Sequence, residues 1–318
     1  MKQRIQYFDF LRGLAIMMVV AIHTSRSSSS LSIDSGIRQI INCAVPLFLA
    51  ISGFFLAKKE ISERKSYYNF LKKQISKVYF PALIWSLPLL VLSLYRGEDV
   101  LKSVCLFLVC GYSIYYFIAL IIQYYIMLPI LQHLTLFGGF VALIATMLSI
   151  FIFKYAITIK LPLIIYGGIF TMWLVFFVIG ILLSKMKSRD YKISIWIVLA
   201  IISFVCALFE MNYFYNKDEV YWGIKPSSHI MSLCIIILLF SQKVQSFYKE
   251  NIFTKTIAKI GSVSFGIYLI HCYFISFIEK FNYGWIFYWM LTVAASYCVV
   301  AGVRAVAPQV AKRIGFTY

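Results

Sequence analysis

Three ionisable residues, Asp9, Arg12 and His23, lie within the first long apolar segment of the chain, residues 7–24. Ionisable groups in such segments are costly to bury and usually mark a functional site. On an α-helix, Arg12 and His23 lie within about 20° of the same azimuth and about 16 Å apart along the axis. Asp9 lies on the same stripe, three residues before Arg12, where its carboxylate can pair with the guanidinium. A buried cation aligned with a neutral imidazole can hold an anionic ligand and take a proton from a hydroxyl.

The same three residues also allow a structural interpretation. Asp9 and Arg12 would then be an ion pair at the membrane interface, and His23 would cap the outer end of the helix. The sequence alone leaves both interpretations open.

A second polar stripe lies in the apolar segment 261–279. Ser264, Tyr268 and His271 follow one another at i, i+4 and i+7 and therefore share one helix face. A lone histidine in an apolar helix is usually a packing residue, so His271 is a candidate for a structural, relay or substrate-binding role. His23 is the better candidate base because it is aligned with Arg12.

Composition identifies the protein that must position these residues as a membrane protein. The chain has 318 residues, of which 62% are apolar and 13% charged, and its mean hydropathy is +0.85. An ordinary soluble domain has about 25% charged residues, so this chain cannot cover a water-facing surface. The same composition excludes a disordered protein and a nucleic-acid-binding protein, despite a formal charge of +18. The seven cysteines show no CxxC pairing, which predicts neither a disulfide framework nor a metal site.

The apolar segments predict an all-α bundle of about ten transmembrane helices, formed as a single domain over residues 1–318. The expected spans are 7–24, 39–57, 78–95, 113–132, 138–153, 168–184, 193–209, 227–241, 261–279 and 284–303. Residues 101–111 are apolar but short and are expected to form a re-entrant or interfacial piece. With both termini in the cytoplasm, the inner segments hold 20 Lys and Arg residues and the outer segments hold nine, which supports this orientation.

Two further groups of residues are candidates for binding. The predicted cytoplasmic loop from Lys58 to Lys77 has seven cations, enough to hold phosphates, although the positive-inside bias also explains them. On the outer side, Glu210 precedes a segment rich in aromatic and polar residues that ends at Trp222. Tyr115 and Tyr116 enter from the same side, and such mixtures form an aromatic belt or bind a sugar.

Four motifs, in this order along the chain, resemble the membrane acyltransferase 3 family. They are the run Tyr7 to Ile16 with His23 beyond it, the run Val45 to Phe55, the basic stretch Phe70 to Val78 with Pro81, and the run Ser264 to His271. These proteins have ten spans and acylate hydroxyls or amines of cell-envelope glycans.

The resemblance implies a multi-pass protein of the bacterial cytoplasmic membrane that moves an acyl group, usually acetyl, from acyl-CoA to an envelope polysaccharide or glycolipid. His23 would be the general base or a transient acyl carrier, with Arg12 on the cofactor or thioester and Asp9 positioning Arg12. Lys72, Lys73 and Lys77 would bind the cofactor. Glu210, Tyr115, Tyr116, Tyr268 and His271 would bind the acceptor. No metal is expected.

The chain departs from the family pattern at two places. Lysines stand where arginines are usual before the third span, and Ser113 to Phe117 replaces the usual opening of the fourth span. Because a lysine lacks the bidentate fork of arginine, the cofactor geometry there is open. An exporter or flippase that uses the same cavity without chemistry, and a sensing module, are the alternative functions. No paired inverted repeat with broken helices is visible, which counts modestly against a transporter.

Overall fold

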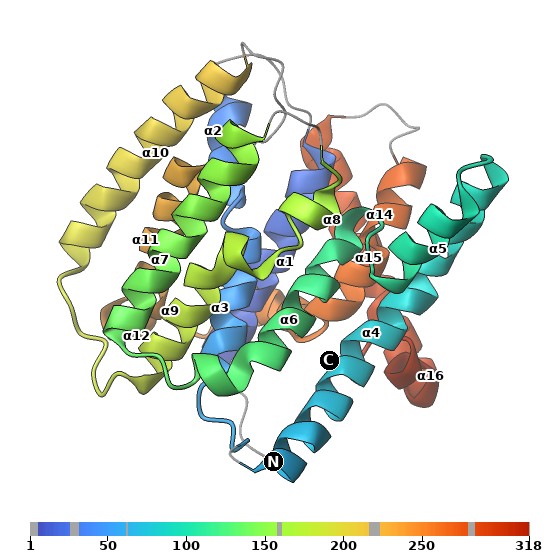
Figure 1. Cartoon of the computed structure of the whole chain (residues 1–318), viewed down its shortest axis with the longest axis horizontal. Helices are drawn as coiled ribbons and strands as arrows, with labels where there is room; N and C mark the ends of the chain where they lie inside the picture. Colours follow the sequence, from blue (N-terminus) through green and yellow to red (C-terminus); the bar gives the residue numbers. More distant parts are fainter. Residues whose placement is uncertain are drawn as a thin grey trace.

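Every element in the described part of the chain is a helix, and the helices form one bundle (Figure 1). The computed structural model describes residues 6–25, 32–61, 63–157, 161–215, 223–278 and 284–317. Elements labelled η are short 3₁₀ or π helices. The elements are α1 (Gln6–Thr24), α2 (Ile33–Ile41), α3 (Ala44–Leu56), α4 (Arg64–Tyr95), α5 (Val100–Leu108), η1 (Ser113–Tyr115), α6 (Tyr116–Leu131), α7 (Leu136–Phe151), η2 (Ile152–Ala156), α8 (Leu163–Tyr166), η3 (Phe170–Trp173), α9 (Leu174–Lys185), α10 (Ile193–Tyr215), α11 (Pro226–Phe240), α12 (Gln242–Ser246), α13 (Ile252–Ser262), α14 (Ser264–Ile278), α15 (Trp285–Val306) and α16 (Pro308–Arg313).

Seven described helices are long and apolar enough to cross a membrane, and an eighth crossing is possible if a bent pair counts as one span. The bent pair is α13 with α14, which meet at 82°. Two predicted spans contain shorter apolar helices, Phe170–Lys185 and Pro226–Phe240. At about 1.5 Å per residue these reach roughly 24 and 22 Å, less than the hydrocarbon thickness of about 30 Å. The membrane class is therefore confirmed, while ten spans and cytoplasmic termini stay predictions.

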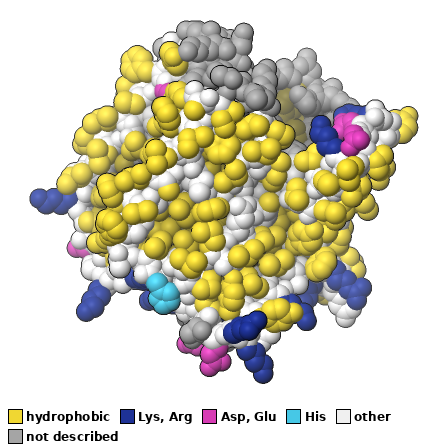
Figure 2. Space-filling model, in the orientation of Figure 1, with side chains coloured by type: hydrophobic (Ala, Val, Ile, Leu, Met, Phe, Trp, Pro, Cys, Tyr) yellow, Lys and Arg dark blue, Asp and Glu magenta, His cyan; other side chains and the backbone are white. Residues whose placement is uncertain are grey.

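The surface agrees with this class. Figure 2 shows a broad apolar band across the middle of the molecule, with most of the visible Lys and Arg side chains along its lower edge. Helices α7 and α10 contribute much of the exposed apolar surface, with side chains such as Phe140, Leu148, Ile201 and Phe209. In water such a surface would aggregate, whereas lipid chains solvate it.

The structure corrects the predicted cytoplasmic loop from Lys58 to Lys77. Helix α4 already begins at Arg64, so most of this basic stretch is helical and continues without a break into the apolar part. Lys, Gln and Arg are good helix formers, and hydropathy does not distinguish a polar helix from a loop. Residues 101–111 form the short helix α5, which ends at Leu108 and packs against α4.

Glycines bring two pairs of helices into backbone contact. A Cβ at Gly261 of α13 would lie 1.8 Å from the carbonyl oxygen of Asp9, and one at Gly13 would lie 2.1 Å from that of Ile257. Gly53 of α3 and Gly180 of α9 make an equivalent contact, each 2.1 Å from a backbone oxygen of the facing helix. Small residues permit this close approach, which drives helix association in lipid. The first contact fixes α13 against the start of α1.

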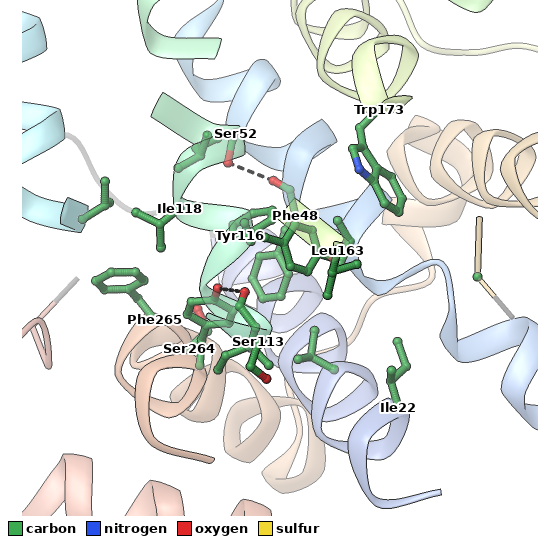
Figure 3. Close-up of a pocket in the computed structure, with 18 of the residues that line it drawn as sticks. Ile22, Phe48, Ser52, Ser113, Tyr116, Ile118, Leu163, Trp173, Ser264 and Phe265 are labelled. Carbon is green, nitrogen blue, oxygen red and sulfur yellow. Dashed lines mark hydrogen bonds between the residues drawn. The ribbon is translucent and has the colours of Figure 1, made fainter. Parts of the chain in front are cut away.

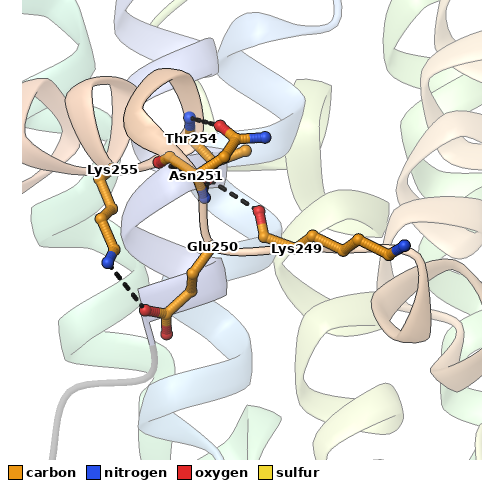
Figure 4. Close-up of polar contacts among 5 residues, drawn as sticks. All are labelled: Lys249, Glu250, Asn251, Thr254 and Lys255. Carbon is orange, nitrogen blue, oxygen red and sulfur yellow. Dashed lines mark hydrogen bonds and ion pairs between the residues drawn. The ribbon is translucent and has the colours of Figure 1, made fainter.

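The start of α13 is set by a capping box (Figure 4). The Asn251 side chain accepts from the backbone N–H of Thr254 at 2.9 Å, and the Thr254 hydroxyl accepts from the backbone N–H of Asn251 at 3.0 Å. Lys255 adds an exposed ion pair with Glu250 at 3.6 Å. Because the cap satisfies free amides of the first turn, it fixes where α13 begins, and the 82° bend between Ser262 and Ser264 separates α13 from α14.

Candidate functional site

A cavity of about 530 Å³ lies inside the bundle, and its lining includes Arg12 and His23. Both residues come from α1, which is buried along much of one side. Side chains of α3, α6, α8 and α14 form other parts of the wall, among them Phe48, Tyr116, Leu163 and Ser264 (Figure 3). Eleven residues of helix separate Arg12 from His23 by about 16 Å. The cavity therefore has an Arg12 end and a His23 end.

The Arg12 end is basic. Arg12 donates to the Asp9 carboxylate at 2.7 Å, and its guanidinium lies 5.0 Å from the centre of the Phe55 ring. The expected ion pair between Asp9 and Arg12 is thus present, and it fixes the guanidinium on the cavity wall. Gln74 and Lys77 of α4 line the same cavity. A fixed guanidinium and an ammonium on the wall of one cavity suit an anionic group such as a phosphate.

The His23 end holds two imidazoles. The rings of His23 and His271 lie 5.4 Å apart, centre to centre. Nδ1 of the buried His271 faces the backbone carbonyls of Tyr268 at 2.8 Å and Ile267 at 3.2 Å. Because carbonyls only accept, Nδ1 must carry the proton and Nε2 is left as an acceptor. His271 therefore has a fixed tautomer, and its Nε2 lies 3.6 Å from the Cys272 sulfur.

His23 itself is exposed and makes no hydrogen bond to another described residue. Its side chain is accessible from the cavity, so its imidazole is available to a bound substrate. This distinguishes it from His271 and from His229, which are both buried.

Two residues of the polar stripe on α14 line the cavity, whereas the third, His271, is buried outside the lining. Ser264 and Tyr268 line the wall, and the Tyr268 hydroxyl donates to the carbonyl of Ile114. Tyr116 also lines the cavity. Tyr115 does not. It is buried, and its hydroxyl faces the carbonyls of Leu269 at 2.8 Å and Trp85 at 3.1 Å.

Besides Asp9, His271 and Tyr115, three other predicted residues lie away from the cavity lining. Lys72 and Lys73 are exposed on α4, so Lys77 is the member of this trio that reaches the cavity. Glu210 accepts from the Tyr155 hydroxyl at 2.7 Å and from the side chain and backbone of Ser227. These contacts join α10 to η2 and α11. The rest of the aromatic segment after Glu210, residues 216–222, lies outside the described residues.

Arg38 lines the His23 end of the cavity although the sequence places it in an outer loop. The predicted second span begins at residue 39, whereas in the structure helix α2 (Ile33–Ile41) continues into α3 as one candidate span, Ile33–Leu56, which contains Arg38. The polar pattern of α2, with Arg38, Gln39 and Asn42 close together, is the signal that indicates a lined surface rather than a loop.

Two residues close together in sequence have a strained backbone, and one of them lines the cavity. Cys110 has φ 54° and Ser113 has φ 47°, which is unusual for residues other than glycine. Ser113 lines the cavity and opens the segment that departs from the family motif. Such strain persists where the surrounding structure holds it, often at functional sites.

Behind the His23 end, Lys225 is buried just before α11. Its ammonium donates to the Gln39 side chain at 2.9 Å and to the Ala207 carbonyl at 3.2 Å. Burial lowers the pKa of Lys225 to about 8, which the charge of Glu210 partly offsets. Within the described chain, no three His, Cys, Asp or Glu residues are placed to hold a metal ion.

A polytopic membrane protein with a basic group at one end of an internal cavity and an accessible imidazole at the other has the parts of a group-transfer enzyme. Residues 5–305 match the Acyltransferase domain of the acyltransferase 3 family, which is nearly the whole chain. The protein belongs to this family and is a membrane acyltransferase. No curated protein and no solved structure gave a match.

Proposed function

We propose that the protein transfers an acyl group, most simply acetyl, from acyl-CoA to a hydroxyl or amine of a cell-envelope glycan or glycolipid. The observation that carries this proposal is the single cavity that joins Arg12 to His23. The phosphates of the donor would bind at the Arg12 end, and the thioester would extend toward His23. The acceptor would enter from the other end.

The proposed donor site consists of positively charged side chains on the cavity wall. Arg12 is fixed by Asp9, and Lys77 adds a second cation on the cavity wall. Arg12 presents a planar fork to a phosphate, whereas Lys77 acts as a point charge. Lys72 and Lys73 are exposed on the same helix and would attract the donor at the entrance rather than inside the cavity.

Transfer needs a base at the reacting end. His23 would take the proton of the acceptor hydroxyl, the oxygen would attack the thioester carbonyl, and the bond from carbon to sulfur would break to release the CoA thiolate. Alternatively the imidazole attacks first and carries the acyl group as an intermediate. In both routes the ring of His271, 5.4 Å away, would limit the movement of the His23 ring by packing beside it.

The walls suit a sugar more than a polymer. Aromatic side chains such as Phe48, Tyr116 and Trp173 offer flat faces, with Ser113 and Asn42 as polar neighbours. A volume of about 530 Å³ is within the range of about 300–1,000 Å³ typical of small-molecule sites. This size favours an enzyme that binds one arm of a donor and one sugar over an exporter of a polysaccharide chain.

The test is acyl transfer by the purified protein in liposomes. Radiolabelled acetyl-CoA and a soluble or lipid-linked glycan are supplied, and label in the glycan is measured. We expect transfer by the wild-type protein. A protein that binds a glycan but shows neither acetyl-CoA binding nor transfer would favour the exporter instead.

A further inference from the structure

We propose that the acceptor is anionic, and that its carboxylate or phosphate pairs with Arg38 beside His23. This inference rests on the proposed acyl transfer and narrows its acceptor to a class of substrate. The candidate ligands are sugars that carry a negative group close to the hydroxyl or amine to be acylated.

The contacts of Arg38 leave its charge uncompensated. Nη1 donates to the carbonyl of Ile22 and to the hydroxyl of Ser25, both neutral acceptors near the end of α1. Nε is buried and has no hydrogen-bond partner. No carboxylate pairs with Arg38 among the residues that the structure describes. A guanidinium without a carboxylate partner favours an anion, because a charge-assisted hydrogen bond compensates for the water that it has lost.

The charges that line the cavity also favour an anionic ligand. Its described lining includes Arg12, Arg38, Lys77 and His23 but no Asp or Glu side chain. Asp9 already pairs with Arg12, and the donor's phosphates would add negative charge at that end of the cavity. Arg38 is left for a second anion about two to three helical turns away along α1.

The surroundings of Arg38 strengthen this preference. The next residue, Gln39, accepts a hydrogen bond from the buried ammonium of Lys225 at 2.9 Å, and Ser228 donates to the same oxygen at 3.0 Å. The ammonium has carbonyl and amide oxygens as its hydrogen-bond partners, not a carboxylate. Lys225 adds a second positive charge behind this wall, which Glu210 partly balances, and a low-dielectric environment strengthens the effect of Arg38 on a bound charge. A neutral sugar would leave Arg38 without a counter-charge.

A binding assay tests the anion site independently of the acyl-transfer reaction. The probes are methyl glucoside, methyl glucuronide and methyl glucoside 6-phosphate, titrated calorimetrically into the full-length protein in nanodiscs. These share one ring and differ in charge, and the two anions separate a carboxylate from a phosphate. We expect the wild-type protein to bind at least one anion more than tenfold more tightly than the neutral glucoside. Equal or tighter binding of the neutral glucoside would overturn the proposal.

Variants of Arg38 test the residue itself. Arg38→Gln should weaken binding of the anion about 10- to 100-fold, as expected for loss of hydrogen bonds to a charged group, and leave the neutral glucoside unchanged. Arg38→Lys should recover part of the loss, because it keeps the charge without the fork. Arg96→Gln, at an exposed arginine after α4, is the matched control and should bind like the wild type. Thermal unfolding of each variant reports whether the contact of Arg38 with Ile22 and Ser25 is needed for folding.

Transfer kinetics then separate a binding role from a role on the reacting atoms. If Arg38 pairs with the acceptor, Arg38→Gln raises KM for the anionic acceptor and leaves kcat nearly unchanged. An equal loss of kcat for neutral and anionic acceptors would mean that Arg38 stabilises the transition state or the fold, and would overturn the proposal. Absence of transfer to every acceptor would refute the proposed acyl transfer, whereas the binding data would still decide whether the anion site exists.

Discussion

The contact between α13 and α1 provides a quantitative test of how the site is held. In Gly261→Ala the new Cβ would lie 1.8 Å from the Asp9 carbonyl oxygen and 2.6 Å from the Gly13 nitrogen. Real Cβ contacts essentially never fall under 3.0 Å, so the helices must separate by at least 1.2 Å. Both neighbours are backbone atoms and cannot rotate away. Overpacking of this kind costs about 1–3 kcal/mol, and we expect a value at the upper end of that range.

The same shift moves the start of α1, which carries Asp9 and Arg12. A displacement of about 1 Å in a site can cost on the order of 100-fold in rate, so we expect acyl transfer to fall by that order in Gly261→Ala. The assays are thermal unfolding in detergent and transfer from radiolabelled acetyl-CoA. Gly302→Ala is the control: it lies in α15 with nothing within 4 Å of the added Cβ. It should be stabilised by about 0.5–1 kcal/mol. Equal stability and activity in both variants would refute the reasoning.

Two other predictions concern side chains of the site. Arg12→Lys keeps a positive charge beside Asp9 but loses the planar guanidinium, which can make two parallel hydrogen bonds to a phosphate. In initial-rate measurements, KM for acetyl-CoA should therefore rise about tenfold or more, with little change in KM for the acceptor. An unchanged KM for acetyl-CoA would give Arg12 a packing role. Tyr115→Phe removes a hydroxyl that faces two carbonyls and should lower stability by about 0.5–1.5 kcal/mol without changing KM for the acceptor, whereas Tyr116→Phe should change that KM. The opposite pattern would place Tyr115 in the acceptor site.

Local periodicity was enough to predict the face of α1. Asp9, Arg12 and His23 lie on one stripe because helix geometry fixes their azimuths, and the ion pair follows from their spacing. The approach of His271 to His23 depends on how α14 packs against α1, which the sequence pattern does not contain. Family motifs supplied the order of the segments but not this contact.

Other features depend on long-range packing and on boundaries that hydropathy does not resolve. The sequence places Arg38 in a loop because the predicted second span begins at residue 39, whereas the structure begins this span at Ile33. Tyr115 and Tyr116 are neighbours in sequence, yet about 100° of helical rotation sends one toward backbone carbonyls and the other to the cavity. Glu210 looked exposed on the outer side, but partners from two other segments satisfy it.

The central claim is that His23 performs chemistry at one end of the cavity. The most direct measurement is acyl transfer from radiolabelled acetyl-CoA to a glycan by purified protein in liposomes, with His23→Ala compared with His133→Ala. His133 is exposed in the turn after α6 and outside the cavity lining, so it is a matched control. The account predicts that His23→Ala folds and binds acetyl-CoA but transfers at least 100-fold more slowly, as expected for loss of a general base, while His133→Ala behaves as the wild type. Undiminished transfer by His23→Ala would contradict the account.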